Sequence, residues 1–267
     1  MKNNPIGIFD SGIGGLTVLR ELIKALPSED TAYLGDTARV PYGTKSAETV
    51  TSYSLEITEF LVEYGIKALV VGCNTASAFS VEKLRAVHTI PIIGVIEPGA
   101  KAAAKATRTK RVGVIGTEGT IRSNAYSNAI KEIDPNIVVY NKACPLFVPL
   151  AEEGWTNNEV AAATVREYLS DIKDEHIDTL VLGCTHYPLL KEIIGEFFGH
   201  DVTLIDSAEE TALEANHILT SKDLLNENNS ASHKFFVTDS AKRFQVIGTK
   251  FLGKDEEIDA ELIKLGK

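Results

Sequence analysis

The sequence is poor in cysteine and has no long apolar run. Its three cysteines, Cys73, Cys144 and Cys184, are an odd number and form no CxxC pair. A disulfide framework is therefore not expected, and a reducing compartment would keep all three as thiols. No apolar stretch approaches the roughly 20 residues that a membrane-spanning helix requires. We therefore predict a protein without a membrane segment.

An excess of positive charge is also missing. The 267 residues carry a formal net charge of −10, whereas phosphate-backbone binding depends on clustered lysine and arginine, so direct nucleic-acid contact is not predicted. The most basic stretch, Lys101–Arg111, is interpreted as an alanine-rich helix whose C-terminal end carries cations that suit the helix dipole. The N-terminus passes from MKNNP straight into an apolar strand without signal-peptide features, which predicts a cytoplasmic location.

Short apolar runs of β type alternate with helical patterns along the chain. The expected strands are Ile6–Phe9, Ala32–Leu34, Ala68–Val71, Ile92–Ile96, Val112–Ile115, Ile137–Tyr140, Thr179–Leu182 and Val202–Ile205. The expected helices include Leu16–Ala25, Ser46–Tyr64, Ser80–Val87, Ser123–Glu132, Asn158–Lys173 and Leu189–Phe198. This alternation is typical of α/β folds with mainly parallel sheets, and strands that are apolar throughout indicate sheets covered on both faces.

An internal repeat indicates the domain organisation. The segment ALVVGCNT (Ala68–Thr75) matches TLVLGCTH (Thr179–His186), which places Cys73 and Cys184 111 positions apart. In the same order, GIFDSG from Gly7 corresponds to GVIGTEG, 106 positions later. These matches predict a duplicated α/β unit.

We therefore predict two similar, pseudo-symmetric α/β domains with mainly parallel sheets and an active site between them. The first domain comprises residues 1–97 with a C-terminal return segment, 207–267, and the second comprises residues 98–206. The return segment lies outside the repeat. It is expected to pack on the first domain, although the sequence alone leaves that open. Within it we expect a helix over Glu209–Leu219, a polar link over Asn226–Ser232 and a hairpin made of Phe235–Val237 and Phe244–Ile247.

Each half places a Gly-Cys pair directly after a strand, where ligands of open α/β sheets gather. If the halves face each other about a pseudo-twofold axis, the thiols of Cys73 and Cys184 reach one pocket from opposite sides. Inversion of a stereocentre by proton transfer needs a base on one face of the carbon and an acid on the other. A thiol fills either role once its surroundings lower its pKa from about 8.5. Asp10, Ser11 and His186 are the candidate tuning groups.

Each of these residues also has a purely structural interpretation. A single cysteine after a strand is more often a small buried apolar residue than a catalyst, and Cys144 is interpreted in that way. The equivalent positions of Cys73 and Cys184 in the repeat favour a function for this pair. Asp10 could instead cap a following helix, and His186 could be a satisfied buried histidine.

Several motifs resemble the signature blocks of bacterial glutamate racemases, which belong to a cofactor-independent aspartate/glutamate racemase family. The matching blocks are FDSGIGG (9–15), GDTARVPYG (35–43), VGCNTAS (71–77), IGVIEPG (93–99), PLAEEG (149–154) and LGCTHYP (182–188). The resemblance spans essentially the full chain. It implies interconversion of L- and D-glutamate without pyridoxal phosphate or metal, to supply D-glutamate for peptidoglycan synthesis, and it implies a homodimer.

The resemblance also implies roles for individual residues. Cys73 would remove the α-proton of D-glutamate and Cys184 that of L-glutamate, with Asp10 assisting the first and His186 the second. Hydroxyls, amides and backbone N–H groups can receive the substrate carboxylates without a salt bridge. The residues expected to hold the substrate are Asp10, Ser11, Tyr42, Gly43, Asn74, Thr75, Thr185 and His186. The residues expected to support the pocket are Asp36, Glu152, Thr117 and Thr120, and a plain turn role is equally open for the two threonines.

Other functions stay open at this point. An aspartate or hydantoin racemase of the same architecture would keep both cysteines. A phosphate loop at Gly12–Gly15 lacks the last glycine of GxGxxG, because position 17 is Thr17. A Cys/His hydrolase built on Cys184 leaves Cys73 unexplained, and neither HExxH nor a cysteine pair with finger spacing indicates zinc. A module that only binds an amino acid would not exchange its α-hydrogen.

Overall fold

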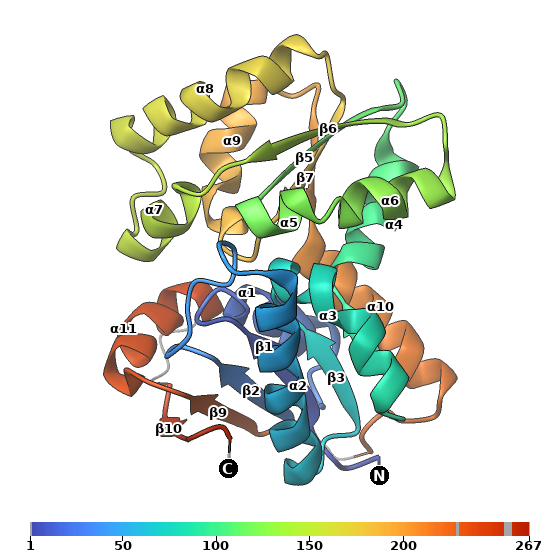
Figure 1. The fold of residues 1–267 in the computed structure, drawn as a ribbon, viewed down its shortest axis with the longest axis vertical. Helices are drawn as coiled ribbons and strands as arrows, with labels where there is room; N and C mark the ends of the chain where they lie inside the picture. The colour runs from blue at the N-terminus through green and yellow to red at the C-terminus, as the bar shows by residue number, and fades with distance from the viewer. Residues whose placement is uncertain (1, 228–229, 254–257, 267) are drawn as a thin grey trace.

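The computed structural model describes residues 2–227, 230–253 and 258–266. Two β-sheets lie in the two halves of the molecule, with helices packed around them (Figure 1). The first sheet has the strand order β10-β9-β2-β1-β3-β4 and the second has the order β6-β5-β7-β8. Every strand pair in both sheets is parallel. The predicted α/β class with mainly parallel sheets is therefore confirmed.

The elements follow the predicted alternation of strands and helices. The strands are β1 (Ile6–Asp10), β2 (Thr31–Gly35), β3 (Ala68–Val71), β4 (Ile92–Gly94), β5 (Arg111–Gly116), β6 (Val138–Ala143), β7 (Thr179–Gly183), β8 (Thr203–Asp206), β9 (His233–Val237) and β10 (Ala260–Leu262). The helices are α1 (Leu16–Ala25), α2 (Ala47–Tyr64), α3 (Asn74–Val87), α4 (Ile96–Ala106), α5 (Glu118–Arg122), α6 (Ala125–Ile133), α7 (Phe147–Glu153), α8 (Glu159–Asp174), the 3₁₀ helix η1 (Tyr187–Leu190), α9 (Lys191–Phe198), α10 (Ser207–Ser221) and α11 (Ala241–Leu252).

The sequence repeat corresponds to a repeat in the topology. In the first sheet β1 lies between β2 and β3, with β4 beyond β3, and in the second sheet β5 lies in the same way between β6 and β7, with β8 beyond β7. Phe9 pairs with Val71, and Ile115 pairs with Leu182. Ile115 is 106 positions beyond Phe9 and Leu182 is 111 positions beyond Val71, so both predicted offsets are reproduced.

Helix bounds that the sequence predicted closely have identifiable caps. Ser46 precedes α2, and its hydroxyl accepts a hydrogen bond from the N–H of Thr49. Gly65 ends the same helix with a φ of 98°, a left-handed conformation that glycine adopts without steric cost. Asn158 caps α8 by accepting from the N–H of Ala161. Such caps each contribute about 1 kcal/mol and mark a helix end locally.

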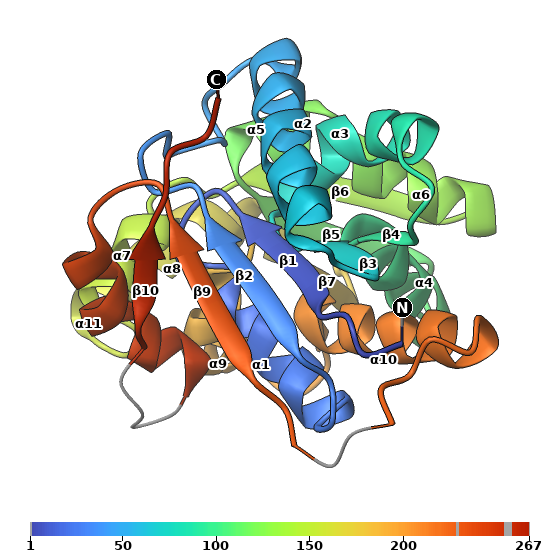
Figure 2. The same cartoon turned by 90° about the horizontal axis from the view of Figure 1, so that it is seen from below.

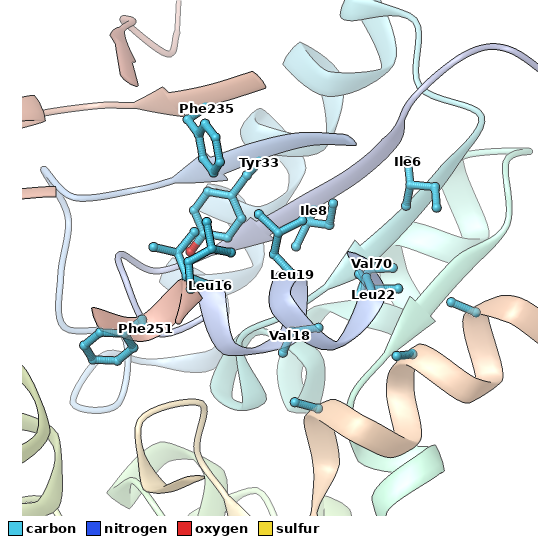
Figure 3. Close-up of a cluster of buried hydrophobic side chains, with 14 of the residues drawn as sticks. Ile6, Ile8, Leu16, Val18, Leu19, Leu22, Tyr33, Val70, Phe235 and Phe251 are labelled. Atoms are coloured by element: carbon cyan, nitrogen blue, oxygen red, sulfur yellow. The ribbon is translucent and has the colours of Figure 1, made fainter. Parts of the chain in front are cut away.

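The core of the first half forms where α1 packs on the sheet. Its apolar residues recur at helical spacing and meet strand residues such as Ile8 and Val70 (Figure 3). The α1 residues in this cluster are Leu16, Val18, Leu19 and Leu22. Burial of each such side chain contributes roughly 1.5–3 kcal/mol relative to exposure. This packing holds the segment between β1 and α1, and with it Asp10 and Ser11, against the sheet.

The return segment joins the first sheet, but not as a hairpin. Strand β9 pairs with β2 and β10 with β9, at one edge of the sheet (Figure 2). The predicted second hairpin strand, Phe244–Ile247, lies inside α11, so that prediction is wrong. Parallel neighbours need a crossover, and Phe244 and Phe251 lie seven positions apart, which buries both on one face of a helix. The predicted polar link includes residues 228–229, which lie outside the described residues.

Two predicted elements near the middle of the chain have different bounds. Strand β4 ends at Gly94, and Ile96 already begins α4, so the strand predicted over Ile92–Ile96 was too long. Helix α4 ends at Ala106, so most cations of the basic stretch follow the helix instead of forming its end.

Asp178 explains why α4 stops there. Its carboxylate accepts hydrogen bonds from the hydroxyl of Thr107 at 2.6 Å and from the N–H groups of Arg108 and Thr109 at 2.7 Å each. Burial raises the pKa of Asp178, but these bonds outweigh burial and hold that pKa at about 2.

In the part of the chain that the structure describes, no helix has both the length and the apolarity to cross a bilayer.

Candidate active site

Residues that directly follow several strands meet in one pocket between the halves. The pocket is lined by Ser11, Pro41, Tyr42, Gly43, Cys73, Asn74, Thr75, Thr117, Val148, Cys184, Thr185 and His186. It therefore brings Cys73 and Cys184 together, as the repeat predicts. A larger hollow of about 280 Å³ lies between α3, α4 and α6, but no cysteine or histidine is among its described lining residues. Chemistry, not size, identifies the site.

Cys73 stands at the end of β3 and is the N-cap of α3. Its Sγ accepts from the N–H of Ala76 at 3.5 Å and lies 3.8 Å from the Ser11 Oγ. Helix α3 thus begins six residues before the predicted start at Ser80, because the thiol itself serves as the cap. Burial, together with the charge of Asp10, raises the pKa of Cys73 to about 12 despite these contacts. Without substrate, Cys73 is therefore a thiol at neutral pH.

Cys184 stands at the equivalent end of β7 and has a histidine beside it. Its Sγ lies 3.8 Å from Nδ1 of His186, whose Nε2 lies 3.2 Å from Oε1 of Glu152. Arg243 of α11 donates to the other oxygen of Glu152 at 3.1 Å. Burial lowers the pKa of His186, but its bonds to Cys184 and Glu152 and the charge of Asp10 outweigh burial and raise the pKa to about 10. His186 is therefore an imidazolium at neutral pH.

Asp10 lies behind the pocket lining. Its Oδ2 accepts from the N–H of Gly12 at 2.8 Å, and its buried Oδ1 has no hydrogen-bond partner among the described residues. Burial raises its pKa, although the charge of His186 opposes this shift. Asp10 does not cap α1, because the N-cap is Gly15 and makes no side-chain cap bond. Its charge raises the pKa of both Cys73 and His186.

Three threonine hydroxyls cluster at one side of the pocket, with Thr75 and Thr117 in its lining and Thr120 outside the described lining. Thr75 Oγ1 lies 2.8 Å from Oγ1 of Thr117 and 3.1 Å from that of Thr120. The cluster joins α3 of the first half to the β5–α5 connection of the second. Thr117 also caps α5, so its turn role and its pocket position coexist. Gly43 faces Thr117 so closely that a Cβ at Gly43 would lie 2.7 Å from Thr117 Cβ.

Asp36 is not among the described residues that line the pocket but contacts one that is. It is fully buried and accepts a hydrogen bond from the hydroxyl of Tyr42, which does line the pocket. Arg39 donates to the same carboxylate at 2.7 Å, and Thr238 donates to its other oxygen at 2.9 Å. Asp36 therefore positions Tyr42.

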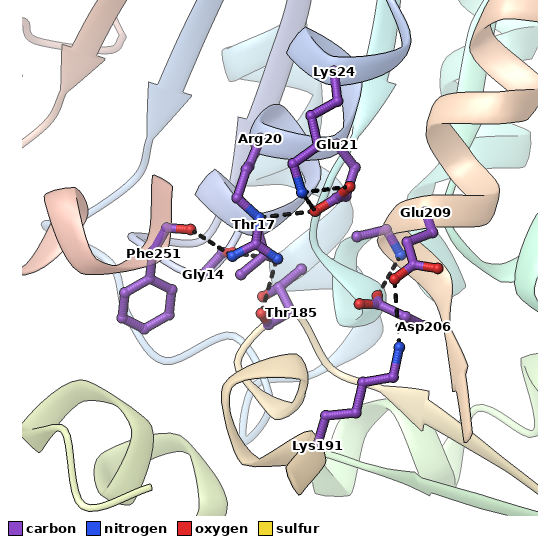
Figure 4. Close-up of polar contacts among 11 residues, drawn as sticks. Gly14, Thr17, Arg20, Glu21, Lys24, Thr185, Lys191, Asp206, Glu209 and Phe251 are labelled. Atoms are coloured by element: carbon purple, nitrogen blue, oxygen red, sulfur yellow. Dashed lines mark hydrogen bonds and ion pairs between the residues drawn. The ribbon is translucent and has the colours of Figure 1, made fainter. Parts of the chain in front are cut away.

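The loop that carries Thr185 is held by α1 of the other half. The hydroxyl of Thr17 contacts the backbone oxygen of Thr185 at 2.9 Å and that of Gly14 at the same distance (Figure 4). A Cβ at Gly14 would lie 2.2 Å from Thr185 Oγ1, so the two loops meet at a position that only glycine fits.

Some residues of the site were not singled out from the sequence. Pro41 and Val148 line the pocket from different halves, and the Val-Pro dipeptide that recurs at 40–41 and 148–149 was a signal that could have found them. Arg243 lies in a segment predicted to be part of a hairpin, and no local motif marks it.

Known proteins are similar to this chain in both sequence and fold. The family profile described as Asp/Glu/Hydantoin racemase matches residues 6–215. The chain belongs to that family. The glutamate racemase of Geobacter metallireducens is 63% identical over 249 residues, which cover 93% of this chain and 92% of that protein. The predicted resemblance to glutamate racemases is therefore confirmed, and the enzyme is an isomerase.

Solved structures agree with the sequence comparison. A glutamate racemase isoform from Bacillus anthracis has a TM-score of 0.96 and 45% identity, covering 99% of both chains. The glutamate racemase from Francisella tularensis, solved in complex with D-glutamate, has a TM-score of 0.92 and 39% identity, covering 99% of this chain and 98% of that one. The whole chain, including its return segment, thus shares the fold of these racemases.

Proposed function

We propose that this enzyme interconverts L- and D-glutamate by proton transfer at the α-carbon, with Cys73 and Cys184 as the two acid/base groups. The observation that carries the proposal is that both sulfurs line one pocket from equivalent positions of the two halves. The D-glutamate complex of the Francisella relative supports the choice of substrate. Relatives that match nearly the full chain are glutamate racemases, so an aspartate or hydantoin substrate has less support.

The proton transfer balances as follows. From L-glutamate, the Cys184 thiolate takes the α-proton, and the electron pair of the broken C–H bond delocalises into the α-carboxylate. Cys73 then donates its S–H proton to the opposite face of the carbon, which leaves Cys73 as thiolate and Cys184 as thiol. From D-glutamate the two sulfurs exchange roles. In the substrate-free site Cys73 is protonated, and the imidazolium of His186 can stabilise a thiolate that forms beside it.

Neutral donors hold the substrate in this proposal. No lysine or arginine is among the described residues that line the pocket, although glutamate brings two carboxylates. The hydroxyls of Ser11, Thr75 and Thr185 and the amide of Asn74 can donate to them, as can backbone N–H groups such as that of Gly43. Tyr42 and Thr117 complete this wall, Thr120 contacts the Thr117 hydroxyl from outside the described lining, and Glu152 holds His186.

Hydrogen exchange at Cα tests the proposal directly. In deuterated water, reduced enzyme and L-glutamate should yield D-glutamate that carries deuterium at Cα, with loss of optical rotation. Mass spectrometry of the separated enantiomers would measure this incorporation. A protein that binds glutamate without exchanging its α-hydrogen would contradict the proposal. Faster racemisation of aspartate or of a hydantoin would leave the two-thiol chemistry standing and overturn the substrate.

Loss of the His186 proton is expected to lower kcat/KM as pH rises through about 10. The pKa of His186 is raised from its ordinary value of 6.5, so the imidazolium persists below about pH 10 and is lost above it. Glu152→Gln replaces the charged acceptor that raises this pKa with a neutral amide oxygen, so the alkaline limb of the pH–rate profile should move toward neutral pH. An alkaline limb that stays in place in this variant would contradict the role given to Glu152.

The cellular context extends the same proposal. We infer a cytoplasmic enzyme that supplies D-glutamate for peptidoglycan synthesis and works as a homodimer. Light scattering of the purified protein would test the homodimer.

We also infer domains of residues 1–97 with 207–267 and of residues 98–206. The membership of the two sheets supports this division, with residues 1, 228–229, 254–257 and 267 outside the described chain.

A further inference from the structure

Tyr126 touches the neighbours of both cysteines. It belongs to α6 of the second half and is 2% exposed. Its hydroxyl donates to Oδ1 of Asn74 at 2.7 Å, and Asn74 directly follows Cys73. Its ring packs on Gly183, which directly precedes Cys184, and a Cβ at Gly183 would lie 3.0 Å from Tyr126 Cε2. One buried side chain of the second half thus reaches the backbone beside one sulfur and the amide beside the other.

The Tyr126 hydroxyl also lies where the chain passes between the halves. The backbone oxygen of Val95, at the end that leaves the first sheet for α4, is 3.4 Å away. Ser207, where the chain passes from β8 into α10, lies beside the same hydroxyl, because a Cβ at Gly99 would lie 3.3 Å from Tyr126 Oη and 3.4 Å from Ser207 Cβ. Both connections between the sheets therefore contact the group that orients Asn74.

The bond from Tyr126 determines what Asn74 can offer to a ligand. Because Oδ1 accepts the phenol proton, the amide presents its NH₂ group elsewhere. Asn74 lines the pocket, yet its buried Nδ2 has no hydrogen-bond partner in the described parts of the chain. A buried donor without a partner is costly, and the cost is relieved when a ligand brings an acceptor. A substrate carboxylate is such an acceptor.

We propose that Tyr126 is a positioning residue for racemisation. By holding Oδ1 of Asn74, it keeps the amide N–H groups turned toward the substrate carboxylate. Because Tyr126 belongs to the second half and Asn74 to the first, this orientation depends on how the two halves are placed. Without the phenol hydroxyl, the amide can rotate and present its oxygen to the carboxylate, which repels it. This inference rests on the proposed function, because it takes Asn74 as a substrate ligand.

A double-mutant cycle with Asn74 tests the proposal. Tyr126→Phe keeps the buried ring and removes only the hydroxyl, and it should lower kcat/KM by about 10-fold, the effect of one hydrogen bond. In an Asn74→Ala background the same change should have no further effect on kcat/KM, because the group that it orients is gone. A merely structural role would instead give the same loss in both backgrounds, and equal losses would overturn the proposal.

Further variants keep the test decisive. Ser207→Ala removes the hydroxyl of a side chain that lies beside the phenol hydroxyl and should lower kcat/KM less, with no effect in the Tyr126→Phe background. Tyr168→Phe is the matched control, because its hydroxyl accepts a hydrogen bond from the N–H of Leu146 and is absent from the described lining of the pocket, and it should keep wild-type kcat/KM. If Tyr126→Phe does not fold, the same cycle is measured with Ser207→Ala and Asn74→Ala. Ser207→Ala should then lower kcat/KM only where Asn74 is present, and an equal loss in both backgrounds would overturn the proposal.

The outcomes separate this inference from the proposed function. If the wild-type enzyme fails to exchange the α-hydrogen of glutamate, the proposed function falls. If the wild type racemises glutamate and Tyr126→Phe matches it in kcat/KM, only the role of Tyr126 is overturned.

Discussion

Cys184→Ala should lower kcat/KM by about 1,000-fold or more, because it removes one of the two groups that move the α-proton. Cys73→Ala should cause a loss of the same order. L- and D-glutamate have equal free energies, so their equilibrium constant requires equal kcat/KM in the two directions for every variant. The loss must therefore be the same with either enantiomer, and circular dichroism of the reaction mixture would measure both.

Cys144→Ala is the matched control for these two variants. Cys144 is buried in the core cluster of the second half, and burial raises the pKa of its thiol. It is absent from the described lining of the pocket, so its removal should leave kcat/KM close to the wild-type value. If either Cys73→Ala or Cys184→Ala keeps near-normal turnover, one base suffices and the two-base assignment is wrong.

Lys67→Met should lower the free energy of unfolding by about 3–5 kcal/mol, the cost of leaving one partner of a buried ion pair without its counter-charge. The Lys67 ammonium is fully buried, and it pairs with Glu29, whose side chain is 3% exposed. Lys67 also donates to the backbone oxygen of Lys2, and Glu29 accepts from the N–H of Asn226. The pair thereby ties the start of the chain and the return segment to the first sheet, so its loss should weaken the packing of both segments.

Urea unfolding of three variants would check this prediction. Lys67→Met and Glu29→Met should each be destabilised, because each leaves a buried charge unpaired. The double variant should recover most of the loss, because it removes both charges and fills the space with apolar groups. The pair lies outside the catalytic pocket, so kcat of folded Lys67→Met should stay at the wild-type value. A destabilisation below about 1 kcal/mol would show that the pair behaves like an exposed one.

Local patterns predicted most of the helices and strands, and they singled out Cys73 and Cys184 as the two cysteines of one pocket. Helix α1 was predicted with its observed bounds, since its apolar spacing spans Leu16–Ala25, and Ser46 and Asn158 marked two helix starts by capping chemistry. The repeat made Cys73 and Cys184 equivalent before any fold was known. These signals are local or depend on comparing two short segments, so one sequence was enough to contain them.

Contacts between distant segments needed the tertiary structure. The sequence by itself determined two duplicated α/β halves and a Gly-Cys pair after one strand of each. Only the fold decided that α11 connects the parallel strands β9 and β10 and brings Arg243 to Glu152. It also decided that the hydroxyl of Tyr126 reaches Asn74. The physical reason is that a hydrogen bond depends on a distance of about 3 Å between groups that lie dozens of positions apart. Hydrophobic spacing along one segment carries no information about such a distance.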